Sequence, residues 1–140
     1  KIKNNLISNL RIMKKILLLI MLLINFLGWS QEQKPEEIVQ KQVEAYNSGK
    51  IEDFLSFYSE DVKIYTYPNK LETEGKNAMR ESYASFFKNA KKLHCTITKR
   101  IVTKNIVIDE EQIQYNESQF GGVAIYEVEN NKIIKVTFFQ

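Results

Sequence analysis

The chain has 140 residues, a length typical of one domain. Of its 20 basic residues, five lie within the first 30 positions, where none of the 17 acidic residues is found, so the rest of the chain carries a formal charge of −2. This charge balance argues against nucleic acid as a partner. A single cysteine excludes an intramolecular disulfide, and one neighbouring histidine leaves no metal-binding cluster, so the sequence indicates no metal or other cofactor.

Residues 1–30 have the pattern of a leader. Met13 is followed by two lysines and an apolar run over residues 16–26, and small residues stand at the end of the segment. These features are typical of a secretory signal peptide. A membrane anchor is the alternative, but spanning a bilayer takes ~20 apolar residues and this stretch is shorter. We expect cleavage near Ser30, no stable membrane anchor afterwards, an exported protein (periplasmic or secreted), and one domain over residues 31–140.

The first half of that domain favours three helices and one strand. Pro35 and the acidic pair after it suit the start of a helix that extends to Ser48. A short helix follows, with one apolar stripe made by Ile51, Phe54, Leu55 and Tyr58. The strand after it, ended by Pro68, alternates Val62, Ile64 and Thr66 with Lys63, Tyr65 and Tyr67. A polar loop over residues 69–74 leads to a third helix over residues 76–89, whose aromatic side chains are expected in the core.

The second half changes to period two, which predicts consecutive strands. The first begins at Leu93, with Cys95, Ile97 and Ile101 on one face and His94, Thr96, Thr98 and Arg100 on the other. Further strands are predicted over residues 107–115, 123–128 and 132–139, with turns at Asn105 and at the pair Asn130 and Asn131. Helices followed by consecutive strands with short connections favour an α+β fold with a mainly antiparallel sheet.

The order of these motifs resembles the nuclear transport factor 2-like superfamily, in its SnoaL-like and steroid delta-isomerase-like branch. The resemblance runs from Glu36 to the C-terminus and depends on the sequences AYNSG, YSEDV, a strand ending in YP, EGK before the third helix, NIVID, AIY and NKI. It implies a cone: a strongly curved, mainly antiparallel sheet wrapped around three N-terminal helices, with a pocket inside. Members commonly dimerise through the outer face of the sheet, so it also implies a homodimer.

The resemblance places three positions of the isomerase site at Gln42, Tyr67 and Tyr126. The isomerase has a tyrosine, a carboxylate base and a protonated aspartate there, and none of the three is retained. We therefore expect no delta-5-3-ketosteroid isomerase activity. Gln42 and Tyr126 can still donate hydrogen bonds, which favours a ligand site for a small, largely apolar molecule with a polar end. Tyr58 and Tyr65 are expected to belong to the same site.

Other candidates for chemistry remain open. Gln42 either faces inward and needs a partner or lies in solvent at the margin of its helix. Asp109 and Glu111 share a face with Val107, and we expect an ion pair on the open face of the sheet, although an inward carboxylate could act as a base. No catalytic residue is identified. Three functions remain: a ligand-binding module, an isomerase- or cyclase-type enzyme acting by proton transfer, or a dimerisation and protein-interaction module.

Overall fold

A computed structural model describes residues 13–17 and 33–139. The chain divides into two units, Lys1–Gln31 and Glu32–Gln140. In the first unit the described residues, 13–17, form a single helical segment; the expected cleavage site near Ser30 lies outside the described residues. Among the described residues, no helix has both the length and the apolar character needed to cross a membrane.

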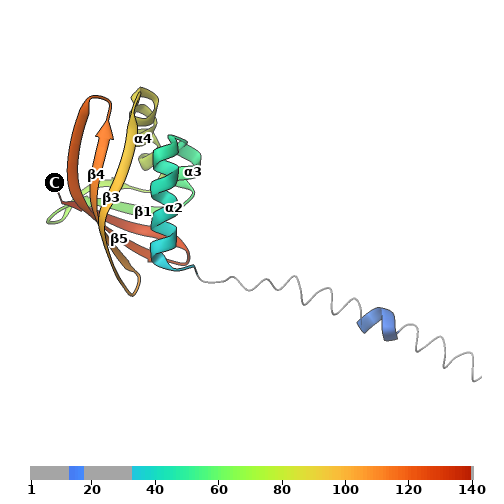
Figure 1. Ribbon diagram of the computed structural model, residues 1–140. Coiled ribbons are helices and arrows are strands. Elements are labelled where there is room, and N and C mark those ends of the chain that lie inside the picture. Colours follow the sequence, from blue (N-terminus) through green and yellow to red (C-terminus); the bar gives the residue numbers. More distant parts are fainter. Residues whose placement is uncertain (1–12, 18–32, 140) are drawn as a thin grey trace, which may run out of the picture. The chain divides into compact units, whose positions relative to one another are not determined.

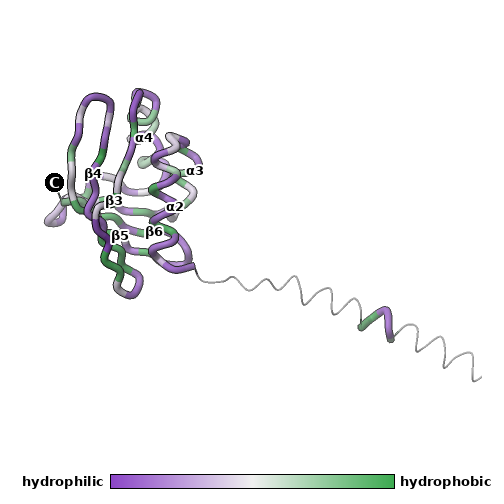
Figure 2. The backbone as a smooth tube through the Cα atoms, viewed as in Figure 1, coloured by the Kyte–Doolittle hydropathy of each residue, from purple (hydrophilic) through white to green (hydrophobic). Residues whose placement is uncertain are grey.

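Three helices lie on one side of a curved sheet in the second unit (Figure 1). Helix α2 spans Pro35–Ser48, starts at a proline and ends at Gly49, whose φ of 68° is the left-handed conformation that glycine adopts readily. Helix α3 spans Ile51–Leu55 and helix α4 spans Lys76–Asn89. Hydrophilic and hydrophobic residues alternate around α2 (Figure 2), and its apolar side packs against the sheet.

The sheet has six strands in the order β2-β1-β6-β5-β4-β3. Every neighbouring pair is antiparallel except β1 with β6, which is parallel. The strands span Tyr58–Thr66 (β1), Lys70–Glu74 (β2), Leu93–Thr103 (β3), Ile106–Tyr115 (β4), Ser118–Glu129 (β5) and Lys132–Phe139 (β6). This arrangement confirms the α+β prediction of a curved, mainly antiparallel sheet around three helices.

Two strands differ from the sequence-based expectation. The segment predicted as a polar loop forms β2, an edge strand that pairs with β1. Its exposed residues show no apolar alternation, because an edge strand of this kind buries neither face. Strand β5 begins at Ser118 instead of residue 123, because Gly121 and Gly122 pair with β4 and continue the strand.

A register shift in β3 changes which side chains face the helices. The pairing with β4 moves by one residue between Ile97 and Lys99, and a bulge of this kind exchanges the two faces of a strand. After the shift Arg100 is half-buried and Ile101 is 62% exposed. The expectation that Ile101 shares a face with Cys95, and that Arg100 opposes it, is therefore wrong.

Candidate functional site

A cavity of about 280 Å³ lies between the helices and the inner face of the sheet. Aromatic residues from α2, α3, β1 and α4 border it on one side, and residues of β3, β4, β5 and β6 border it on the other. Its lining includes Gln42, Val43, Tyr46, Phe54, Tyr58, Tyr83, Phe86, Cys95, Glu111, Gly122, Tyr126 and Phe138. The volume lies just below the usual range for ligand pockets, so it suits a compact molecule.

The aromatic side of the cavity is held together by ring packing. The ring of Phe54 lies 5.1 Å from that of Tyr58 and 5.0 Å from that of Tyr83. Tyr46 packs against Phe54 at 5.8 Å and Phe86 at 6.1 Å. Tyr83 and Phe86 remain only half-buried on α4, since they border the cavity. Tyr83 and Phe86, which the sequence predicted in the core, therefore form part of the cavity wall.

Glu111 is the one carboxylate that borders the cavity among the described residues. It is 6% exposed, although it belongs to a residue type that is seldom buried without a partner. Burial raises the pKa of its carboxyl group to about 7, while the hydrogen bond from Tyr126 and the charge of Arg100 lower it. The carboxyl group can therefore gain or lose a proton near neutral pH.

Tyr126 and Glu111 form the central hydrogen bond of the site. The Tyr126 hydroxyl donates to Glu111 Oε1 at 2.7 Å, and both side chains are buried. Burial and the negative charge of Glu111 raise the pKa of the hydroxyl of Tyr58 and of Tyr126 well above the usual value, and that of Tyr83 to about 12. These hydroxyls stay protonated at neutral pH, and the hydroxyl of Tyr126 is the one that donates to the carboxylate.

A second buried carboxylate, Asp109, lies two residues before Glu111 on the same strand face. Arg100 holds it in a bidentate ion pair, with Nε and Nη2 each donating to one carboxylate oxygen at 2.7 Å. Arg100 Nη1 also donates to Gln40 Oε1 at 3.1 Å and to the backbone oxygen of Glu36 at 3.4 Å. The Arg100 side chain thus joins α2, β3 and β4 beside the cavity.

Asp109 and Glu111 were expected on the open face of the sheet, and that expectation is wrong. Asp109 is 0% exposed and Glu111 is 6% exposed. The useful signal was that they share a strand face with Val107 and Ile113, whose apolar side chains mark this face as inward. Gly122 pairs with Glu111 across β4 and β5 and borders the cavity, and a side chain there would meet the backbone oxygen of Phe139 at 2.7 Å.

Gln42 faces inward, which resolves the two alternatives for this residue. It borders the cavity, is 4% exposed, and its side-chain oxygen has no hydrogen-bond partner among the described residues. Rotating an amide by 180° exchanges its oxygen and nitrogen. Gln42 can therefore offer a ligand either an acceptor or a donor.

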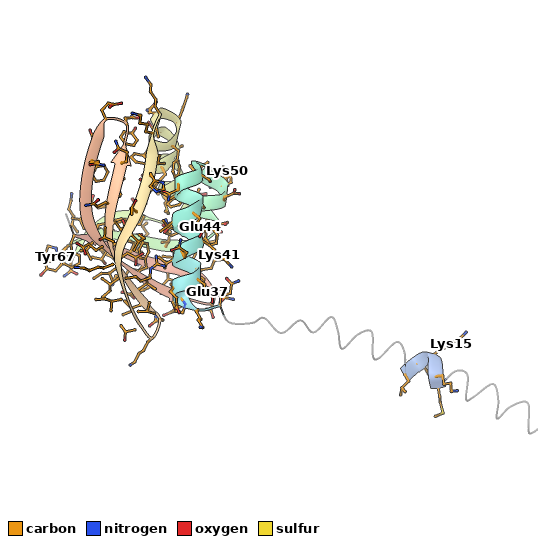
Figure 3. The ribbon with its side chains drawn as sticks, in the orientation of Figure 1. Lys15, Glu37, Lys41, Glu44, Lys50 and Tyr67 are labelled. Carbon is orange, nitrogen blue, oxygen red and sulfur yellow. The ribbon has the colours of Figure 1, made fainter. Side chains whose placement is uncertain are left out.

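Of the five residues expected in the site, the structure brings Gln42, Tyr58 and Tyr126 together at the cavity. Tyr65 and Tyr67 do not border it. Tyr67 is 59% exposed, stacks on Phe139 at 4.4 Å, and lies on the side of the sheet away from α2 (Figure 3). The expected inner position of Tyr67 is wrong, because Val62 and Ile64 face the core and strand alternation directs Tyr65 and Tyr67 outward.

The cysteine and the histidine fit simpler roles. Cys95 is buried as a small hydrophobic residue, and burial with the charge of Glu111 raises the pKa of its thiol to about 12. His94 is exposed on the opposite face of β3. No group of three or more His, Cys, Asp or Glu side chains suited to a metal ion occurs among residues 13–17 and 33–139.

The curved sheet, the helices on its inner face and the cavity between them define a nuclear transport factor 2-like fold. The family model for the SnoaL-like domain matches residues 39–136, and the chain belongs to this family. Comparison with curated protein sequences gave no significant match.

Solved structures agree on the fold. An uncharacterised cystatin-fold protein from Novosphingobium aromaticivorans is 22% identical, with a TM-score of 0.72 over 77% of this chain and 99% of that one. A putative ketosteroid isomerase from Kribbella flavida is 18% identical, with a TM-score of 0.62 over 75% and 76% of the two chains. An epoxide hydrolase from M. tuberculosis is 11% identical, with a TM-score of 0.65 over 75% and 80%. At these identities the likeness concerns the fold alone.

Proposed function

We propose that this protein binds a small, largely apolar molecule in the cavity, with the polar end of the molecule against Glu111. The observation that carries the proposal is a lone, buried carboxylate in a cavity whose other lining side chains are mostly aromatic or aliphatic. A concave apolar site with few converging polar groups is the usual form of a small-molecule site. The aromatic rings supply the contact area, and the carboxyl group orients the ligand.

The cavity itself can be tested by filling it. Ser82 borders the cavity on α4, whereas Ser85, also exposed on α4, is not among its lining residues. We expect cyclohexane derivatives with one polar group to bind the wild-type protein and the Ser85→Trp control, and to lose binding in Ser82→Trp. Titration followed by NMR chemical shifts measures this. Unchanged binding in Ser82→Trp would overturn the proposal.

A second candidate function is an enzyme that moves a proton to or from the bound molecule. It is favoured by the pKa of about 7 for Glu111, since a general acid or base works best when its pKa lies near the operating pH. Tyr58 and Tyr83 could stabilise charge that develops on the ligand. Substrate turnover that is lost in Glu111→Gln, while ligand binding persists, would distinguish the enzyme from a binding protein.

We also propose that the protein is exported and that it forms a homodimer. The leader pattern before residue 31 supports export; expression from Met13 in a Gram-negative host should give periplasmic protein that starts near Gln31. Self-association is supported by the resemblance to a family whose members commonly dimerise through the outer face of the sheet, and Ile101 is an exposed apolar side chain of this sheet. Sedimentation equilibrium should show a homodimer, and a monomer at high concentration would contradict this.

A further inference from the structure

The charges around the cavity are not balanced. Glu111 is its only acidic lining residue, and among the described residues no lysine, arginine or histidine borders it. The nearest strong cation is Arg100, whose guanidinium is engaged with both oxygens of Asp109 and with α2. The ionised form of Glu111 therefore lacks a positively charged partner, and a buried carboxylate without one carries a desolvation cost.

The hydrogen bonds of Glu111 also leave room for a donor. The Tyr126 hydroxyl occupies Oε1, and no hydrogen bond from a described residue reaches Oε2. An ionised carboxylate has about four acceptor sites on its two oxygens. A ligand with a positively charged hydrogen-bond donor would fill a free acceptor site of the Glu111 carboxylate. It would also balance the negative charge of that carboxylate.

The opposite wall suits a cation as well. The rings of Tyr46, Phe54, Tyr58, Tyr83 and Phe86 all border the cavity. Aromatic faces attract cations through their quadrupole, and the attraction is strongest where water is excluded. Carboxylate and aromatic wall therefore favour the same kind of polar end.

We propose that the ligand of this cavity is a small aliphatic amine, bound as its ammonium ion between the Glu111 carboxylate and the aromatic wall. The inference rests on the proposed function and narrows its ligand class from any polar end to a cation. The apolar part of the amine would occupy the remaining cavity, which suits a body no larger than one small ring.

The titratable and charged groups around Glu111 keep their charge near pH 7, so the pH dependence of ligand affinity should report the ionisation of Glu111 alone. They come from six elements and comprise Tyr46, Tyr58, Tyr83, Cys95, Arg100, Asp109 and Tyr126. Burial raises the pKa of these tyrosines and of Cys95, so they stay neutral at pH 7, while Arg100 and Asp109 pair with each other. Glu111 must be ionised to hold an ammonium ion, so the affinity should fall as the pH drops below about 7.

The test compares one apolar body with four polar ends: cyclohexylamine, cyclohexanol, cyclohexanone and cyclohexanecarboxylate, titrated by calorimetry at pH 8. Cyclohexylammonium should bind at least ten-fold more tightly than the alcohol, and the carboxylate should bind least. The affinity of the ammonium ion should be about ten-fold lower at pH 6 than at pH 8, since only about a tenth of Glu111 is then ionised. Buffers of different ionisation enthalpy should show release of about half a proton per amine bound at pH 7.

Two variants with the same change of charge complete the test. Glu111→Gln should abolish the preference for the ammonium ion over the alcohol. Glu110→Gln alters the adjacent residue, exposed on the outer face, and should keep the preference. If Glu111→Gln fails to fold, the pH dependence and proton release of the wild-type protein still decide the matter.

The outcomes separate this inference from the proposed function. Tighter binding of cyclohexanol or cyclohexanone than of the ammonium ion would overturn the amine and leave the binding cavity in place. An ammonium preference that survives in Glu111→Gln would also overturn it. If none of the four compounds binds at pH 8, both the amine and the cavity proposal fail.

Discussion

Asp109 and Glu111 lie two residues apart on one face of β4, yet their environments differ. Asp109 is fully buried and is matched by the two parallel hydrogen bonds of Arg100. Glu111 is almost as buried, but its partner is the neutral hydroxyl of Tyr126. The same strand thus carries one compensated and one uncompensated carboxylate.

The difference follows from what covers each residue. Helix α2 covers Asp109, and Gln40 with the backbone of Glu36 helps to position Arg100 over it. Glu111 instead borders the cavity, where no cationic side chain lies among the described residues. One carboxylate therefore joins helix to sheet, and the other is available for a ligand.

The largest effect is expected from breaking the compensated pair. Arg100→Met leaves Asp109 buried without a cation, which typically costs about 3–5 kcal/mol. Urea unfolding at pH 7 measures the loss. The double variant Arg100→Met with Asp109→Leu should recover most of it, because no charge then remains buried. A loss below about 1 kcal/mol for the single variant would show that the pair is not compensating a buried charge.

The next largest effect concerns Glu111, the uncompensated carboxylate. Replacing it should stabilise the protein at high pH, whereas Arg100→Met destabilises it. The pKa of Glu111 is raised from 4.5 to about 7 in the folded state, so its contribution to stability is complete below pH 4.5 and is lost as the pH rises through 7. The loss amounts to about 3 kcal/mol. Glu111→Gln does not titrate, so its free energy of unfolding relative to wild type should increase by about that amount between pH 4 and pH 8.

Glu110→Gln serves as the matched control for this prediction. Its side chain is about half exposed beside Lys99, where ion pairs contribute little. The stability of this variant relative to wild type should hardly change between pH 4 and pH 8. A parallel pH dependence in the two glutamine variants would mean that burial does not distinguish the two glutamates.

A smaller effect should follow from removing the hydroxyl of Tyr126. Tyr126→Phe keeps the ring in the core but deletes the hydrogen bond that lowers the pKa of Glu111. The pKa of Glu111 should rise further, and the free energy of unfolding at pH 8 should fall by about 1.5 kcal/mol. An unchanged Glu111 pKa, followed by carbon-detected NMR, would place the hydroxyl outside its electrostatic environment.

The smallest effect is expected at Tyr67, on the outer face. Tyr67→Phe keeps the stacking on Phe139 and removes an exposed hydroxyl, so stability should change by less than about 0.5 kcal/mol. Binding of cyclohexane derivatives should not change. Weaker binding in this variant would show that Tyr67 belongs to the ligand site.

The sequence predicted those features of the fold that depend on local chemistry. The bounds of α4 were predicted as observed, because Gly75 precedes it and the apolar period changes after Asn89. The turn before β6 was predicted from Asn130 and Asn131, which adopt φ values of 50° and 60°. Such signals lie within a few residues of the structure that they specify.

The features that were missed depend on contacts between distant segments. The bulge that brings Arg100 inward lies in a stretch of ordinary strand residues, and its consequence is visible only once β3 is paired with β4. Glu111 was judged by the usual exposure of acidic residues, although Val107 and Ile113 lie on the same face of the strand. Tyr67 was placed by resemblance, against the alternation of its own strand.

The most direct test of this account is the titration of the Glu111 carboxyl group in the free protein. Carbon-13 NMR of glutamate side chains, assigned with Glu111→Gln, follows its ionisation between pH 3 and pH 9. The account predicts a midpoint near 7, because the carboxyl group is buried without a cation. A midpoint near the ordinary glutamate value, about 4.3, would show that water or a positive charge reaches it, and would contradict the uncompensated carboxylate on which the proposed site depends.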